Sequence, residues 1–178
     1  SWYPDTLKGE VHGKINLGGK LSTPKLQITS QLEGSDWTWL GERARRIKLQ
    51  VGFDQGTYFA RNVEISKSSG QILGNIEYVS DTEVMKWDLR TENLSLLDFD
   101  FFDRLEIPAK SKIEISSKGE GTLDHLKSKT EARVFGTEIK GERFDDSSFK
   151  MEVGESTVRA SVNVFGDKLS SQIKYSLI

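Results

Sequence analysis

Ile47-Lys48-Leu49-Gln50-Val51-Gly52-Phe53-Asp54 is the stretch of sequence that decides the fold. Its large apolar residues stand at every second position, so their side chains share one face of an extended chain. Lys48, Gln50 and Asp54 take the other face. Strict alternation of this kind is typical of a β-strand with one buried face and one wet face. The stretch therefore predicts a half-buried strand.

Runs of the same kind recur along the chain, separated by turn signals. Two clear examples are residues 149–153 and 158–164. Asp54-Gln55-Gly56 and Ser68-Ser69-Gly70 lie between runs, and such clusters are typical of tight turns between antiparallel neighbours. We expect roughly ten to twelve short strands. The predicted fold class is all-β, with antiparallel strands and one or two short helices.

Two stretches break the alternation and are the candidates for these helices. Residues 35–46 begin with Ser35-Asp36, an N-cap-like pair that predicts one helical turn. The second stretch ends at Pro108 and spaces its large apolar residues as one helix face does: Leu97, Phe101, Phe102 and Leu105. We expect a Phe-rich helix over residues 96–106 that closes one end of the sheet and protects edge strands.

The length of 178 residues corresponds to about one domain. We expect residues 1–178 to form a single β-repeat domain that is a fragment of a larger protein. At an offset of 102, Val51-Gly52 meets Val153-Gly154, which favours an internal duplication. The predicted repeat units are 13–80 and 113–178, and they flank the Phe-rich helix.

Composition excludes several classes of function. The 25 Lys and Arg residues are balanced by 27 Asp and Glu residues, so the net charge of −2 gives no electrostatic basis for binding nucleic acid. The chain has no cysteine, which removes disulfides, thiolate nucleophiles and cysteine metal sites. No run approaches the roughly 18 apolar residues of a membrane span, so we expect none in this segment.

The sequence offers no constellation that indicates catalysis. His12 and His125 each stand alone, without acidic partners at metal-binding spacing. Asp98, Asp100 and Asp103 lack the turn glycine and distant glutamate of a calcium loop, so we interpret them as a solvated helix face. Nucleophile elbows, phosphate loops and complete dinucleotide fingerprints are missing. We expect neither enzyme activity nor a cofactor or metal.

Two clusters of side chains are candidates for binding. Arg43, Arg45 and Arg46 form the densest basic patch, either as contacts to a phosphate head group or as a charged connection before a strand. Trp37 and Trp39 stand two residues apart and would offer either a platform for sugar rings or ordinary packing.

The opening stretch, Gly13-Lys14-Ile15-Asn16-Leu17-Gly18-Gly19-Lys20-Leu21-Ser22-Thr23-Pro24-Lys25-Leu26, carries a family resemblance. It resembles the recurring Gly-x-Leu-x-Leu-x-Gly-x-Leu-x-x-Pro-x-Leu phrase of TamB-like and AsmA-like proteins, the translocation and assembly module family. A second copy begins at Gly119-Glu120-Gly121-Thr122-Leu123, with Leu126 where the proline is expected. About a third of the chain carries this specific resemblance.

The resemblance implies an open β-groove, or β-taco, in the periplasmic part of an inner-membrane-anchored envelope protein. Such a groove shields acyl chains of phospholipid or a similar ligand between the inner and outer membranes. A trough of this kind needs one continuous apolar face over many strands, which the alternating runs supply. The candidate lining residues are Leu26, Ile28, Ile47, Leu49, Val51, Ile113, Ile115, Phe149, Met151, Val158, Val162 and Ile173.

Two other functions stay open at this point. The same family is linked to outer-membrane protein assembly through a barrel-assembly partner, and unpaired edge strands favour binding by β-augmentation. A carbohydrate-binding β-sandwich built around Trp37 and Trp39 is the third alternative. Alternation alone does not separate a groove from a closed sandwich, because both need one apolar face.

Overall fold

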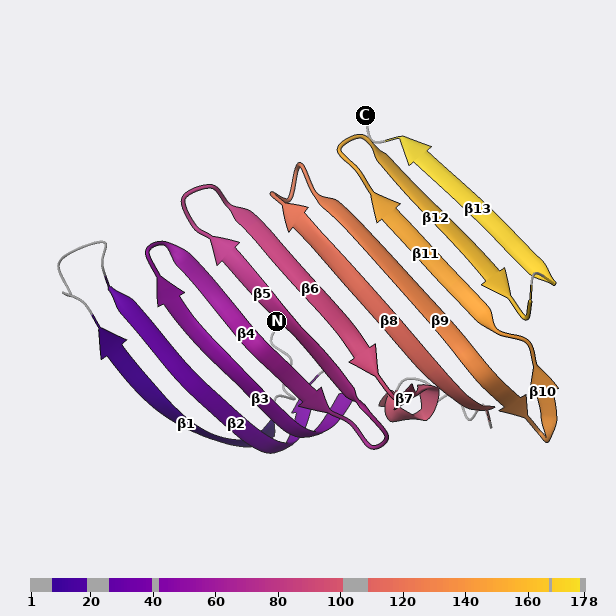
Figure 1. Cartoon of the computed structure of the whole chain (residues 1–178), viewed down its shortest axis with the longest axis horizontal. Helices are drawn as coiled ribbons and strands as arrows, with labels where there is room; N and C mark the ends of the chain where they lie inside the picture. Colours follow the sequence, from indigo (N-terminus) through magenta and orange to yellow (C-terminus); the bar gives the residue numbers. More distant parts are fainter. Residues whose placement is uncertain (1–7, 19–25, 40–41, 101–108, 167, 177–178) are drawn as a thin grey trace, which may run out of the picture.

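The computed structural model describes residues 8–18, 26–39, 42–100, 109–166 and 168–176. These residues form one open antiparallel sheet of thirteen strands, shown as a single layer of ribbons in Figure 1. The prediction of an all-β, antiparallel and open fold is confirmed, with slightly more strands than expected.

The strands follow one another as an up-and-down meander. The first six are β1 (Lys8–Gly18), β2 (Gln27–Trp39), β3 (Glu42–Asp54), β4 (Thr57–Ser66), β5 (Gln71–Val79) and β6 (Val84–Glu92). The others are β7 (Leu94–Ser95), β8 (Ala109–Gly121), β9 (Lys127–Ile139), β10 (Glu142–Phe144), β11 (Ser147–Val153), β12 (Thr157–Val164) and β13 (Leu169–Ser176).

Neighbours in the sheet are almost always neighbours in sequence. The order is β1-β2-β3-β4-β5-β6-β8-β9-β11-β12-β13, and the two short strands β7 and β10 pair with β8 and β9. Within the described residues, β1 and β13 each have a partner on one side only, so they form the two edges of the sheet in Figure 1. The sheet therefore does not close into a barrel.

The turns follow the chemistry predicted from the sequence. Between β3 and β4, Gln55 and Gly56 have φ angles of 46° and 82°, the left-handed pair of a two-residue hairpin turn. Between β4 and β5, the amide of Lys67 donates to the carbonyl of Gly70 over 2.8 Å. These turns place each strand antiparallel to the one before it.

Three β-bulges interrupt the ladders at left-handed residues. Asp36 of β2, Asn62 of β4 and Gly136 of β9 have φ angles of 54°, 51° and 62°, and the register shifts beside each of them. A bulge re-aims the residues that follow it and increases local twist. The helical turn predicted within residues 35–46 is wrong: β2 and β3 occupy the described part of this stretch, and the Ser-Asp pair marks the bulge.

The predicted helix at 96–106 is described only in part. Leu96–Asp98 forms one turn of 3-10 helix, η1, and residues 101–108 lie outside the described residues. Leu94 of β7 pairs with Ile113 of β8 and is fully buried. Leu94 to Asp100, which we call the strap, follows the left-handed Asn93 and lies beside the β4–β5 turn.

The chain buries little of its apolar surface. Its accessible surface is 12,880 Å², whereas a compact monomer of 20.1 kDa exposes about 8,700 Å². The buried hydrophobic side chains among the described residues are few: Ala44, Val63, Leu94 and Ile113. A single-layer sheet explains both observations, because one layer has no partner to cover its apolar side.

The structure also bears on the spacing of the two predicted repeat units. β2 and β9 span residues 27–39 and 127–139, while β4 and β12 begin at residues 57 and 157. These two pairs of strands are spaced by 100 residues, whereas the predicted offset is 102. The duplication itself stays a prediction.

Candidate apolar binding face

The strand register brings most of the predicted lining residues onto one face. Residues directly opposite each other in an antiparallel pair point to the same side. One row crosses all eleven strands of the main path: Ile15, Ser30, Val51, Ala60, Ile76, Trp87, Gly119, Ser128, Val153, Val158 and Tyr175. We call the side of the sheet that carries this row the apolar face.

Eleven of the twelve predicted lining residues belong to the apolar face. They lie in this row or an even number of residues from it: Ile28, Ile47, Leu49, Val51, Ile113, Ile115, Phe149, Met151, Val158, Val162 and Ile173. Leu26 directly precedes β2, two residues before Ile28. Between the rows of Phe53 and Ile47, the described positions of this face carry no Asp, Glu, Lys or Arg.

The apolar face is largely uncovered. Leu17 and Ile15 at one edge are 73% and 68% exposed, and Ile173 at the other edge is 64% exposed. Of the large apolar side chains that are exposed in the described part of the chain, only Leu97 and Leu123 lie elsewhere. Large exposed apolar surfaces are unusual on soluble monomers and are typical of sites that bind another molecule.

The polar groups within the apolar face mostly bind one another. The Trp87 indole donates to Ser117 Oγ over 3.0 Å, and Ser117 Oγ lies 2.9 Å from Thr130 Oγ1. Thr91 Oγ1 accepts from the amide of Ile115 over 2.8 Å. The Ser30 and Ser111 hydroxyls have no hydrogen-bond partner among the described residues. A ligand on this face therefore needs to form few hydrogen bonds with it.

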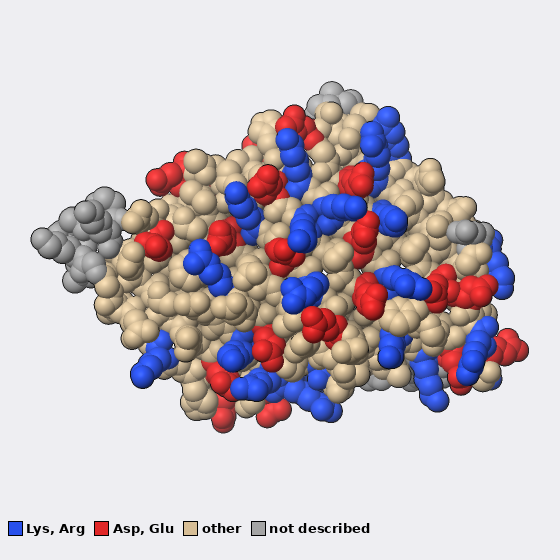
Figure 2. Space-filling model, viewed as in Figure 1, with Lys and Arg blue, Asp and Glu red and all other residues tan. Residues whose placement is uncertain are grey.

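The opposite face is charged and balanced. Figure 2 shows Lys and Arg side chains interspersed with Asp and Glu over the strands. Cross-strand ion pairs include Lys118–Asp88 at 2.8 Å and Lys127–Glu155 at 2.6 Å. The hydrogen bond from Lys127 lowers the pKa of Glu155, and the same contact raises the pKa of Lys127. Mixed, exposed pairs of this kind are typical of a solvated surface.

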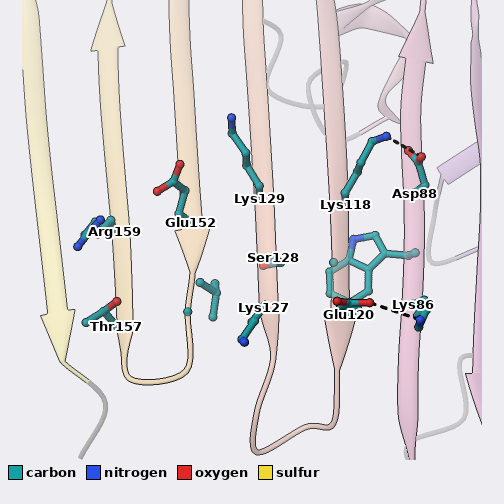
Figure 3. Close-up of a pocket in the computed structure, with 14 residues that line it drawn as sticks. Lys86, Asp88, Lys118, Glu120, Lys127, Ser128, Lys129, Glu152, Thr157 and Arg159 are labelled. Atoms are coloured by element: carbon teal, nitrogen blue, oxygen red, sulfur yellow. Dashed lines mark ion pairs between the residues drawn. The ribbon is translucent and has the colours of Figure 1, made fainter.

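A shallow hollow of about 640 Å³ lies on the charged face, across β6, β8, β9, β11 and β12. Figure 3 shows its labelled side chains, with ion pairs between Lys118 and Asp88 and between Lys86 and Glu120. Lys129 is also paired, with Glu131 at 3.0 Å. The four lysines of this hollow have carboxylate partners, and Arg159 is its one cation without an ion pair among the described residues, so the hollow offers little concentrated charge for a ligand.

An apolar pocket of about 470 Å³ lies at one end of the apolar face. Its apolar walls come from β2, β3, β4, β5 and the strap: Trp37, Ala44, Ile47, Ile65, Ile72 and Phe99. Glu42, Arg43 and Lys67 complete the lining. The bulge at Asp36 precedes Trp37, and the Trp37 ring packs over Gly34, where an added Cβ would lie 2.3 Å from Nε1. The Trp37 indole donates to the carbonyl of Glu10 over 2.9 Å.

A buried cation forms the wall of this pocket beside the strap. The side chain of Lys67 is 6% exposed, and its Nζ lies 2.8 Å from Glu42 Oε2 and 5.3 Å from the centre of the Phe99 ring. The amide of Asp100 also donates to Glu42 Oε2, over 3.2 Å. The ion pair is thus part of the contact between the strap and the sheet.

Two aspartates attach the strap to the sheet. Asp98 caps η1 and accepts hydrogen bonds from the Ser95 amide at 2.9 Å, the Ser69 amide at 3.0 Å and the Ser69 hydroxyl. Asp100 accepts from the amide, Nε and Nη2 of Arg43 at 2.7, 2.9 and 2.6 Å. The hydrogen bond from the Arg43 side chain holds the pKa of Asp100 below its ordinary value.

The aspartates were expected on a solvated helix face, which is wrong for Asp98, a buried residue. Asp103 lies outside the described residues. The spacing of Ser95 and Asp98 is that of a capping box, and this sequence signal could have predicted the contact between them. The burial of Lys67 had no comparable signal in the sequence.

The structure does not gather the three arginines into one anion site. Arg43 binds Asp100 and Arg46 binds Glu33, while Arg45 has no ion-pair partner among the described residues. Trp37 packs on the sheet as described above, and nothing is described of the side chain of Trp39.

The described residues contain no group of acidic or histidine side chains that would hold a metal ion. Nor does this part of the chain include a helix with the length and apolar character needed to cross a bilayer. Comparison with protein-family models, with curated proteins and with solved structures found no match.

Proposed function

We propose that the chain is a segment of a lipid conduit, in which the apolar face shields acyl chains from water. The observation that carries this proposal is the continuous, uncharged and exposed apolar face across eleven strands. Several of its polar groups, such as Trp87, Ser117 and Thr130, bind one another, which suits a hydrocarbon ligand that offers no hydrogen bonds. The resemblance of residues 13–26 to TamB-like and AsmA-like proteins supports the same function and a periplasmic location between two membranes.

The dimensions of the face suit an acyl chain. Phe53 and Ile47 mark its two outer rows and are six residues apart in β3, a distance of about 20 Å along the strand. One leaflet of a bilayer core is about 15 Å thick, half of the ~30 Å core. A lipid chain laid along a strand therefore fits within the uncharged band.

The energetics suit transport without a chemical step. At ~0.8 kcal/mol per buried methylene, a chain of ~16 carbons gains on the order of 10 kcal/mol from leaving water. Neighbouring strands present uncharged side chains at the described positions of the band, so a lipid moves from one to the next without crossing a charged group. Direction then comes from the donor and acceptor membranes.

A matched pair of variants tests the proposal. Leu49 and Gln50 are adjacent in β3 and point to opposite faces. We expect Leu49→Asp to lower binding of a fluorescent phospholipid at least tenfold, because it places a charge in the apolar band, and Gln50→Asp to leave binding within twofold. Equal effects of the two variants, both still folded by circular dichroism, would contradict the proposal.

A protein-assembly module is the second candidate, favoured by the open edges of the sheet. β1 and β13 expose unpaired backbone groups on one side within the described residues, and such edges bind an added strand. This candidate predicts that a barrel-assembly protein binds through an edge. Proline at Asn16 of β1 or at Gln172 of β13 would then weaken binding, whereas Leu49→Asp would not.

A further inference from the structure

The two ends of the apolar face differ in structure. At the end near the β2–β3 and β4–β5 connections, the strap lies against the sheet, Leu94 is fully buried and Phe99 forms a wall of the apolar pocket. The nearby cations Lys67 and Arg43 are paired with Glu42 and Asp100. We call this end, where the strap covers part of the apolar face and these charged groups are paired, the strap end.

The other end of the apolar face carries two exposed tyrosines. Tyr58 of β4 lies opposite Phe53 of β3 and Tyr78 of β5, and Tyr78 lies opposite Met85 of β6. The ring centres of Phe53 and Tyr58 are 4.8 Å apart, and those of Tyr58 and Tyr78 are 6.4 Å apart. Tyr58 and Tyr78 are both exposed. We call these three aromatic residues the tyrosine rim.

Tyrosine suits the boundary between an apolar and a wet environment. Its ring packs against hydrocarbon while its hydroxyl reaches water or a polar group, and it is enriched where membranes meet water for this reason. Among the described residues, no tyrosine lines the pocket at the strap end. Its charged lining residues Glu42, Arg43 and Lys67 are paired with one another or with Asp100, and Trp37 already donates to Glu10.

We infer that a bound phospholipid lies in one orientation, with its head group at the tyrosine rim and its chain ends in the pocket at the strap end. This inference rests on the proposed function. The band of about 20 Å between the rows of Phe53 and Ile47 is close to the length of one leaflet's chains, so a chain along the strands reaches from rim to pocket. Head groups then stay in water while chains pass from strand to strand.

Photoactivatable phospholipids test the orientation on the unaltered protein. One probe carries a diazirine at the end of an acyl chain, and the other carries it on the head group. After illumination, adducts are mapped to residues by peptide mass spectrometry. We expect the chain-end probe to label the surroundings of Trp37, Ile47 and Phe99, and the head-group probe to label the surroundings of Tyr58 and Tyr78.

The outcomes separate the orientation from the proposed function. Strong labelling in the reverse pattern, or the same residues labelled by both probes, would overturn the orientation while the apolar face still binds lipid. Labelling by neither probe, or labelling that a tenfold excess of unlabelled phospholipid does not reduce, would overturn the proposed function and the orientation with it. A more than fivefold preference of each probe for its expected end supports the orientation.

Discussion

Leu32 of β2 lies directly opposite Leu49 of β3, and both side chains remain partly exposed on the apolar face. In a two-layer protein such a pair would form the centre of the core. Here the sheet has one layer, and the pair instead lies within an apolar surface that continues from β1 to β13.

Filling the pocket at the strap end should shorten the chains that the protein accepts. Ala44 is buried and lines this pocket, so Ala44→Phe adds a ring where chain ends are proposed to lie. We expect affinity for phospholipid with 18-carbon chains to fall at least fivefold, and affinity for 10-carbon chains to change less than twofold. Isothermal titration with the two lipids measures this difference; an equal loss for both would place the chain ends elsewhere.

Neutralising only one partner of the Lys67–Glu42 pair should lower the free energy of unfolding. Removing one partner of a buried pair leaves an uncompensated charge, at about 3–5 kcal/mol for a fully buried pair. Because the Glu42 side chain is 35% exposed, we expect Glu42→Gln to lower the free energy of unfolding by about 2 kcal/mol. Adding Lys67→Met should restore most of the loss in urea titrations. A double variant as unstable as Glu42→Gln alone would contradict this account of the pair.

Detaching the strap at Asp98 should destabilise the protein more than removing an exposed acid. Asp98→Ala leaves the Ser69 and Ser95 amides without their acceptor, at about 1–3 kcal/mol. Asp88→Ala breaks an exposed pair with Lys118 and should cost less than about 1 kcal/mol. Urea midpoints of the two variants compare them directly. Equal losses would mean that the strap contributes little to stability.

Acid should weaken the attachment of the strap through Asp100. The hydrogen bond from Arg43 lowers the folded pKa of Asp100 below the ordinary 3.8. A lowered folded pKa stabilises the fold above that ordinary value, and the contribution is lost as the pH falls through the folded pKa. Asp100→Asn should therefore lose stability near neutral pH and show a shallower decline below about pH 4. Parallel urea titrations of both proteins across this range measure it; identical slopes would exclude a role for Asp100.

Alternation in the sequence predicted the strands and their faces because the side-chain period of a strand is two. Once Val51 is placed on the apolar face, the register carries Ile15 and Val158 to the same face across the sheet. Leu49 and Met151 lie on the same face because each is two residues from a member of this row in its own strand. The prediction of lining residues depended only on this local rule.

The strap end was harder to predict because its contacts join segments that are distant in sequence. Trp37 reaches the apolar pocket through the bulge at Asp36, and no alternation pattern reports a left-handed residue within a strand. The contact between Lys67 and Glu42 spans 25 residues and depends on the strap packing over both. The arginines looked like an anion site because their carboxylate partners, Asp100 and Glu33, are remote in the chain.

Mass spectrometry of solvent extracts tests the lipid-conduit proposal most directly. The protein is purified without added lipid or detergent, beside the Leu49→Asp variant and a soluble control protein of similar size. The account predicts phospholipid at near-stoichiometric amounts with the natural chain, and at least tenfold less with the variant and the control. An extract without lipid would contradict the account, whether the chain is monomeric or pairs with a second copy through its apolar face.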